Sequence, residues 1–187
     1  MFERSRVTCY LQVIGLGINV MRTSPFPQME CPVARSLAEV GDAWRVLIVR
    51  DALLGFRRFD EFELNLGIAP NILTQRLNAL VDDGLLEKQA YQLRPARYEY
   101  VPTDKAREFA IVLVALATWG TRWLSPNGAA VTLVDRHTGE PLEATVRGRD
   151  TNRVYASDNM KFVPGPNAGP ETLARIQRLK ARKGKTS

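Results

Sequence analysis

The sequence predicts a mainly α-helical fold with one small β-hairpin, followed by a β-ribbon-like appendage and a basic tail. Apolar residues recur at helical spacing in four successive segments between residues 32 and 81. Two short strand-like segments, 85–89 and 98–101, follow the break at Gly84. The chain has 187 residues, of which 45% are hydrophobic and 25% charged, which is enough for one ordinary core with length left for appendages.

The first two helices are bounded by residues that interrupt regular structure. The prolines of segment 25–27 break the chain, and a helix is expected from Pro32 to about Val40. Gly41 and Asp42 punctuate the chain, and apolar side chains then recur from Trp44 to Leu54, until Gly55 ends the second helix. We therefore expect the folded domain to span 29–125, with residues 1–28 as a poorly ordered extension.

A short third helix and a fourth helix are joined by a tight turn. Residues 58–64 place Phe59 and Phe62 on one inward face, and the glycine-containing segment 65–67 forms the turn. Pro70 suits the first turn of the next helix. The predicted order is helix, turn, helix.

The fourth helix has one apolar stripe and one amide-rich face. The stripe consists of Leu73, Leu77, Leu80 and Val81. The opposite face carries Asn71, Gln75 and Asn78, flanked by Thr74 and Arg76. Amide and guanidinium groups make directional hydrogen bonds to base edges, so this face is a candidate for reading duplex DNA. Polar outward faces also occur on any surface helix.

The two strands are joined by a loop containing Arg94, Pro95 and Arg97. A short helix, a glycine turn, a polar-faced helix and a hairpin tipped with arginines are together typical of a winged helix-turn-helix. In that fold the second helix enters the major groove, and the hairpin, called the wing, reaches neighbouring phosphates or the minor groove. We expect Arg94 and Arg97 to contact DNA.

A last long helix should start after Thr103, which can cap it, with Asp104 and Glu108 in or near its first turn. It is apolar almost all round, so it must be covered on more than one side. A second copy of the chain is the favoured cover, which would match two half-sites on DNA; complete burial within one chain is the alternative. The predicted dimer interface comprises Phe109, Val112, Leu113, Leu116, Trp119 and Trp123.

Several short motifs, taken in order, resemble those of the HxlR-type regulators over about half the chain. They are Cys31-Pro32, Gly41-Asp42-Ala43-Trp44, Arg58-Phe59-Asp60-Glu61-Phe62, Leu73-Thr74-Gln75-Arg76-Leu77, Asp83-Gly84-Leu85 and Tyr98-Glu99-Tyr100. The resemblance implies a dimeric winged helix-turn-helix transcription factor, of a kind that in some members senses electrophiles or oxidants through a cysteine at the N-terminal edge of the domain. The chain departs from the family in having Ala43 for the usual lysine and Phe62 for the usual leucine.

Cys31 is the candidate sensor. A helix N-terminus favours the reactive thiolate, whereas the neighbouring Glu30 disfavours it. The other interpretation is a small apolar residue that packs. Two cysteines and one histidine cannot supply a four-ligand zinc site, so no metal is expected.

Residues 126–187 hold most of the excess of the formal charge of +6. A hairpin is expected from 131–134 and 142–146, and a further strand at 161–163. The tail from Arg175 onward has no acidic residue, and it either contacts phosphates or is a solvated tail with at most a marginal helix.

Other functional classes find little support. There is no phosphate-cradling glycine loop, paired-histidine metal motif or serine elbow, so neither catalysis nor a cofactor is expected. The longest apolar run, 109–117, is too short to cross a membrane. Segment 7–21 is too diluted with polar residues and glycine for a good export signal, and a start at Met21 or Met29 explains it equally well. We expect a cytoplasmic protein.

The sequence therefore predicts a sequence-specific DNA-binding regulator, acting as a homodimer and as a repressor, whose small-molecule inducer it does not name. The rival is a protein-interaction module on the same fold, which the zero net charge of residues 31–125 favours. Arg58 and Arg76 are placed in the DNA-binding set; each either contacts phosphate or holds a carboxylate such as Asp60 or Asp82.

Overall fold

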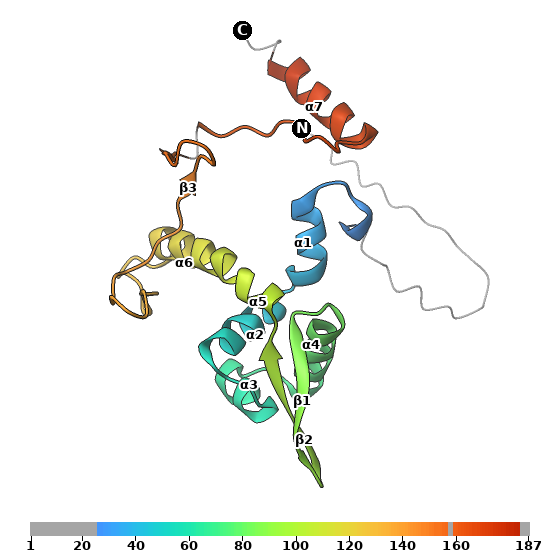
Figure 1. Ribbon diagram of the computed structural model, residues 1–187, viewed down its shortest axis with the longest axis vertical. Coiled ribbons are helices and arrows are strands. Elements are labelled where there is room, and N and C mark those ends of the chain that lie inside the picture. The colour runs from blue at the N-terminus through green and yellow to red at the C-terminus, as the bar shows by residue number, and fades with distance from the viewer. Residues whose placement is uncertain (1–25, 157–158, 184–187) are drawn as a thin grey trace, which may run out of the picture.

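The computed structural model describes residues 26–156 and 159–183. Figure 1 shows a cluster of helices from which a β-hairpin projects at one end, with the C-terminal helix at the opposite end. The elements are a 3-10 turn η1 (Phe26–Gln28), α1 (Pro32–Val40), α2 (Ala43–Leu54), α3 (Phe59–Leu66), α4 (Pro70–Asp82), β1 (Leu86–Leu93), β2 (Ala96–Pro102), α5 (Asp104–Glu108), α6 (Ala110–Leu124), β3 (Val146–Arg147), β4 (Val154–Tyr155) and α7 (Pro170–Lys183). This order confirms the predicted fold class, a mainly α winged helix-turn-helix.

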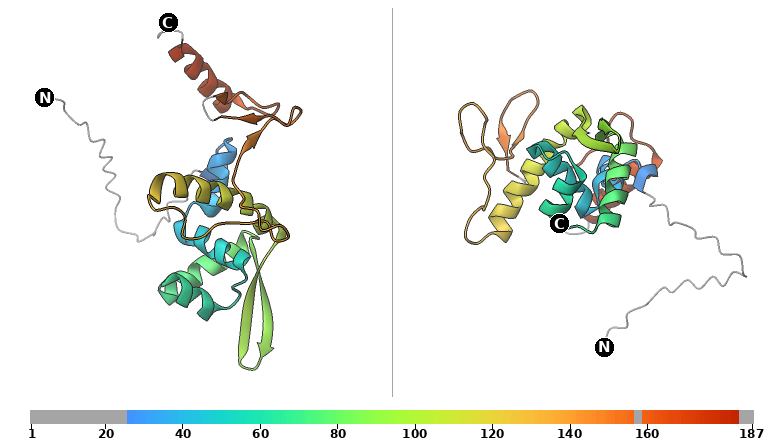
Figure 2. Two further views of the ribbon diagram at one scale, coloured as in Figure 1. Left: turned by 90° about the vertical axis from the view of Figure 1, so that its left-hand side faces the viewer. Right: turned by 90° about the horizontal axis from the view of Figure 1, so that it is seen from below.

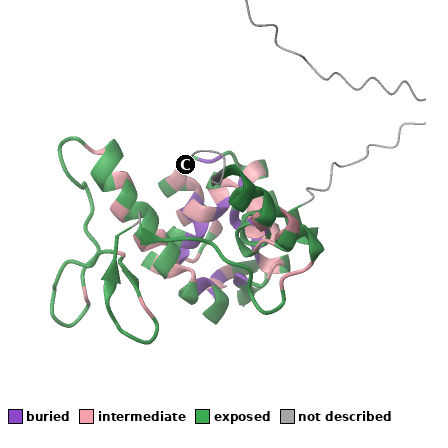
Figure 3. Ribbon diagram, turned by 90° about the horizontal axis from the view of Figure 1, so that it is seen from above, coloured by how far each residue is buried: buried purple, intermediate pink, exposed green. Residues whose placement is uncertain are grey.

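The hydrophobic core lies between α2, α3, α4 and the base of the hairpin. Its largest fully buried apolar side chains are Phe62, Ile48, Leu73, Leu77, Leu80, Leu85 and Leu86. Figure 3 shows the buried residues inside this helical cluster, whereas α6 and the appendage carry exposed and intermediate residues. The predicted stripe of α4 is therefore the centre of the core, which fixes the opposite face outward.

The helix-turn-helix unit is built as predicted, with one difference in α3. That helix runs to Leu66, two residues further than expected, and the Asn65 side chain in its last turn donates a 2.5 Å hydrogen bond to the buried carboxylate of Asp51 on α2. Gly67 then adopts a left-handed conformation with φ 60°, which glycine accepts without steric cost. The chain turns there, and α4 begins at Pro70.

The hairpin is longer than the sequence predicts. β1 and β2 pair antiparallel from Leu86 opposite Pro102 to Leu93 opposite Ala96, which leaves only Arg94 and Pro95 between them. Arg97 therefore lies in β2 and not in the loop, because main-chain pairing continues through polar residues that carry no apolar alternation.

The predicted last helix is two helices. Thr103 caps the first as expected, its hydroxyl oxygen accepting a 3.4 Å hydrogen bond from the amide of Ala106. The helices divide at Phe109, whose side chain packs against the core together with the fully buried Ala106. α5 thus belongs to the core, and α6 extends away from it (Figure 1).

The appendage differs most from expectation. The hairpin predicted over 131–146 is reduced to a single bridge between Val134 and Pro141, because neither segment has a buried face to support a longer ladder. The two-stranded ribbon instead pairs β3 with β4, and residues 161–163 form no strand. The tail forms a 14-residue helix, α7, in place of a marginal one.

Candidate nucleic-acid interface

The outward face of α4 presents four polar side chains. Asn71, Thr74, Gln75 and Asn78 are all exposed, and their spacing of three, four and seven residues places them on one side of the helix. The Thr74 hydroxyl donates a 2.8 Å hydrogen bond to the carbonyl of Pro70, which leaves its oxygen as an acceptor. The face therefore offers three side-chain amides and one hydroxyl oxygen to whatever lies against it.

Arg76 lies beside this face but is held by the protein. Its Nη2 atom is 3.0 Å from Oδ2 of Asp42, the residue that caps α2. Burial raises the pKa of Asp42, but hydrogen bonds from Arg76 and from the amides of Arg45 and Trp44 outweigh it and hold that pKa below its usual value. The carboxylate partner of Arg76 is therefore Asp42 and not Asp82, because the Arg76 side chain faces α2.

Arg58 joins the start of α3 to the wing. Its Nε donates a 3.3 Å hydrogen bond to Glu99, and its guanidinium lies 4.7 Å from the ring centre of Tyr91. The hydrogen bond to Glu99 raises the pKa of Arg58 above its usual value. The partner is thus on the wing and is not Asp60, while the side chain of Arg58 keeps 48% of its surface exposed.

The wing carries the arginines that the sequence predicts and one cation that it does not. Arg94 and Arg97 are exposed, and within residues 26–156 and 159–183 neither forms an ion pair. This cation is Lys88, which lies over the ring of Tyr98 at 4.3 Å from its centre. The signal was available in the alternation of β1, which puts Lys88 and the tyrosines of β2 on one face of the hairpin.

Comparisons with known proteins agree with this arrangement. The model of the HxlR-like helix-turn-helix family matches residues 39–128. A helix-turn-helix-type transcriptional regulator of Mycobacterium bovis is 34% identical over 135 residues, which cover 72% of this chain and 85% of the relative. The chain belongs to the HxlR-like family. It is a transcription regulator with a helix-turn-helix DNA-binding domain.

Two solved structures resemble this HxlR-like regulator over most of its length. PA1374 of Pseudomonas aeruginosa, described as a candidate transcription factor, is 49% identical, with a TM-score of 0.58 over 78% of this chain and 99% of that one. A second candidate transcription factor, PA1607, is 38% identical, with a TM-score of 0.68 over 76% of this chain and 100% of that one. Each match covers more of the chain than the 125 residues that precede the appendage, so both matches extend into it.

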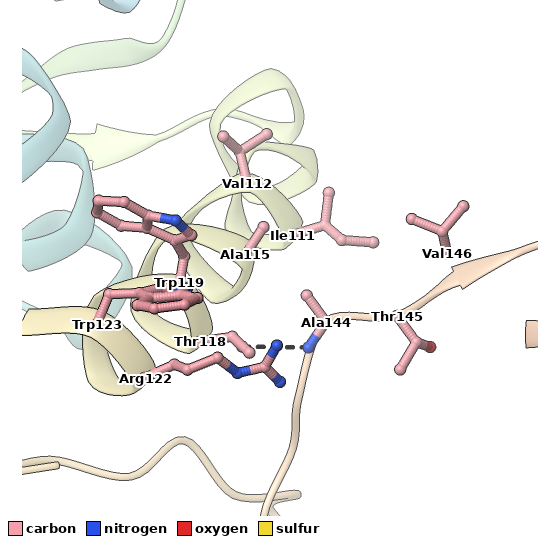
Figure 4. Close-up of a pocket in the computed structure, with 10 residues that line it drawn as sticks. All are labelled: Ile111, Val112, Ala115, Thr118, Trp119, Arg122, Trp123, Ala144, Thr145 and Val146. Atoms are coloured by element: carbon pink, nitrogen blue, oxygen red, sulfur yellow. Dashed lines mark hydrogen bonds between the residues drawn. The ribbon is translucent and has the colours of Figure 1, made fainter. Parts of the chain in front are cut away.

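The HxlR-like regulator exposes one apolar helix face. In α6, Val112, Leu116, Trp119 and Trp123 are exposed, whereas Leu113 and the preceding cap residue Phe109 are half-buried within the chain. A groove runs between α6 and residues 144–146, and the indole rings of Trp119 and Trp123 line it (Figure 4). The Ala144 amide donates a 3.2 Å hydrogen bond to the Thr118 hydroxyl, which ties the appendage to α6. The six predicted interface residues therefore divide into four exposed and two half-buried ones.

Cys31 occupies the N-cap position of α1 and is half-buried. The amides of Ala34 and Val33 favour its thiolate and, with a smaller contribution from Arg175 of α7, lower the pKa of Cys31 below its usual value. Glu30, expected to oppose this, is bound to α7: its carboxylate accepts a 3.1 Å hydrogen bond from the amide of Thr172. The second cysteine, Cys9, lies outside the described residues.

The described part of the chain contains no helix long and apolar enough to cross a membrane. In the same residues no three histidine, cysteine or acidic side chains gather as they would around a metal ion.

Proposed function

We propose that this regulator binds specific duplex DNA as a homodimer, with α4 in the major groove. The exposed amide face of α4, opposite a fully buried leucine stripe, is the observation that carries the proposal. Because the core fixes the back of the helix, the base-contacting set is Asn71, Thr74, Gln75 and Asn78. The side-chain amide of asparagine or glutamine can form two hydrogen bonds with the major-groove edge of adenine, one as donor and one as acceptor, which distinguishes adenine from the other bases. The place of action would be the cytoplasm.

The wing supplies contacts to the DNA backbone in this proposal. Arg94 and Arg97 are exposed and have no carboxylate partner in the described chain, so their charge is available to phosphates. Arg58 keeps an exposed edge next to them, in the hollow between α3 and the wing. The basic helix α7 lies at the end of the molecule opposite the hairpin tip (Figures 1 and 2), so we leave it out of the contacts that one chain makes to its own half-site.

The homodimer is proposed from the exposed face of α6. Four large apolar side chains in one helix form a patch of the kind that monomeric proteins rarely leave in water. A second α6 related by a two-fold axis covers the same residues and presents two recognition helices to two half-sites. A small dimer seated on a promoter occludes it, so repression is the expected result.

Cys31 is the proposed sensor of electrophiles or oxidants. Its support is the position at the N-terminus of α1, the surrounding amides and the lowered pKa. Replacing Cys31 with serine should abolish any oxidant-induced loss of DNA binding. Unchanged oxidant sensitivity in that variant would remove this cysteine from the mechanism.

The alternative is a protein-interaction module that keeps the fold without specific DNA binding. The zero net charge of residues 31–125 favours it, since most DNA-binding surfaces are basic. The two candidates differ in one measurable property, the ratio of affinities for a cognate and an unrelated duplex.

The test titrates the purified full chain with the duplex upstream of its own gene and with a scrambled duplex, over a series of salt concentrations. Preference for the native duplex with a steep salt dependence supports the proposal. Gln75→Ala should reduce the preference by about tenfold, the worth of one good base contact, whereas Gln177→Ala, which removes an exposed amide from α7, should not change it. Arg94→Ala and Arg97→Ala should each flatten the slope of log affinity against log salt by about 0.9. Equal, weak binding to both duplexes favours the protein-interaction module.

A further inference from the structure

We infer that Arg76 is a positioning residue: its ion pair with Asp42 fixes the direction of α4 on α2, and through it the register of the base-contacting face. The inference rests on the proposed DNA-binding function and assigns Arg76 a role other than a phosphate contact. Three observations carry it, namely the bonding of Asp42, a second tie at the end of α4, and the burial of the arginine.

Asp42 is fully engaged at the start of α2. Its Oδ1 accepts the amide hydrogen bonds of Trp44 at 3.0 Å and Arg45 at 3.3 Å, which makes it the cap of the helix. Its Oδ2 lies 3.0 Å from Nη2 of Arg76. Because the cap holds the carboxylate in place, the arginine is held by a fixed point of α2 and not by a mobile surface side chain.

A second tie joins the same two helices further along. Arg45 of α2 forms an ion pair and hydrogen bond with Asp83, the residue that ends α4. The carbonyl of Asp83 also accepts a 2.8 Å hydrogen bond from Lys105, whose ammonium group lies 2.6 Å from Glu39 of α1. Residues 76 and 83 are two turns apart, so the two ties fix the direction of α4, whereas one tie alone would leave it free to pivot.

The burial of Arg76 opposes a direct role in the groove. Its side chain is 29% exposed, and its Nε is covered without a hydrogen-bond partner in the described residues. Residue 76 also lies about 100° around the helix from Gln75, outside the centre of the amide face. If the guanidinium left Asp42 for a phosphate, the partly buried carboxylate would lose its partner. The free-energy cost of that loss exceeds the gain from an exposed ion pair with phosphate.

The test compares Asp42→Asn, Arg76→Gln and the double variant with the wild-type chain. Asparagine is as good a helix cap as aspartate, so Asp42→Asn removes the ion pair and keeps the cap. Each variant is titrated with the native upstream duplex and the scrambled duplex, at a temperature at which circular dichroism shows it fully folded. The ratio of the two affinities reports the register of α4, which a loss of stability alone does not change in a folded sample.

Each single variant should lower the affinity for the native duplex by about tenfold, the worth of one good base contact. The affinity for the scrambled duplex and the salt slope should not change, and the double variant should lose no more than either single one. Reversing the pair, with Asp42→Arg and Arg76→Asp together, should retain less of the preference for the native duplex than Arg76→Lys does. Arginine at position 42 cannot accept the amide hydrogen bonds that cap α2, whereas Arg76→Lys keeps both the charge and the cap.

The inference is overturned if Arg76→Gln weakens both duplexes and flattens the salt slope by about 0.9 while Asp42→Asn binds normally, since Arg76 would then contact phosphate. It is also overturned if neither variant changes the ratio. If Arg76→Gln does not fold, Asp42→Asn alone decides, because it removes the ion pair and keeps both the cap and the arginine: an unchanged ratio of the two affinities in that variant overturns the inference. A wild-type chain that does not distinguish the two duplexes would instead refute the proposed function, and with it this inference.

Discussion

Replacing Trp119 with alanine should weaken the proposed homodimer strongly. Trp119 is 56% exposed in the single chain. A tryptophan buries on the order of 200 Å², so about 110 Å² of this residue is free to enter an interface. At about 25 cal/mol per Å², its burial contributes roughly 3 kcal/mol per chain. Because both chains of a two-fold dimer contribute their Trp119, the free energy of association lost in the variant has an upper limit of about 6 kcal/mol.

Ordering of side chains at the interface offsets part of that free energy. We therefore expect the dissociation constant to rise by at least about a hundredfold, which corresponds to roughly 2.8 kcal/mol. Sedimentation velocity over a dilution series measures it directly. Phe162→Ala is the matched control, because Phe162 is an aromatic residue outside α6 that is 88% exposed. An unchanged dissociation constant for Trp119→Ala, or an equal loss for Phe162→Ala, would refute the assignment of α6 as the interface.

Two further predictions concern stability and reactivity. Leu77→Ala, at a fully buried position of α4, should lower the free energy of unfolding by about 3 to 5 kcal/mol, while Leu64→Ala, at a position 88% exposed on α3, should change it by less than about 0.5 kcal/mol in urea titrations. Similar losses in the two variants would contradict the described core. In a Cys9→Ser background, the rate of Cys31 alkylation should rise with pH around a midpoint below the usual value of a cysteine thiol, because the amides of α1 and Arg175 favour the thiolate. Arg175→Gln should move that midpoint upward; a midpoint at or above the usual value in the parent protein would show that the helix end does not activate the thiol.

The fold could be predicted because it depends on patterns that are local in the sequence. The leucine spacing of α4, the break at Gly41 and Asp42 and the glycine at 67 each specify a backbone conformation through neighbouring residues alone. The outward amide face follows directly, since committing one side of a helix to the core exposes the other.

The predictions failed where main-chain hydrogen bonding decided the structure. Pairing of β1 with β2 continued through polar residues and carried Arg97 into the strand, whereas the two exposed segments expected to form a hairpin in the appendage pair at one bridge. Hydrogen-bond ladders join main chains, so side-chain alternation reports them only where one face is buried.

The extent of α4, its buried leucine stripe and the family that the motifs resemble all follow from local patterns of residues. The partners of the charged residues follow instead from the packing of the helices. In the folded chain Arg76 pairs with Asp42 and Arg58 pairs with Glu99, and Arg175 helps to lower the pKa of Cys31. These partners are separated by 34, 41 and 144 positions in the chain. Ion pairs of such separation follow from how helices pack on one another, and no local pattern of residues encodes them.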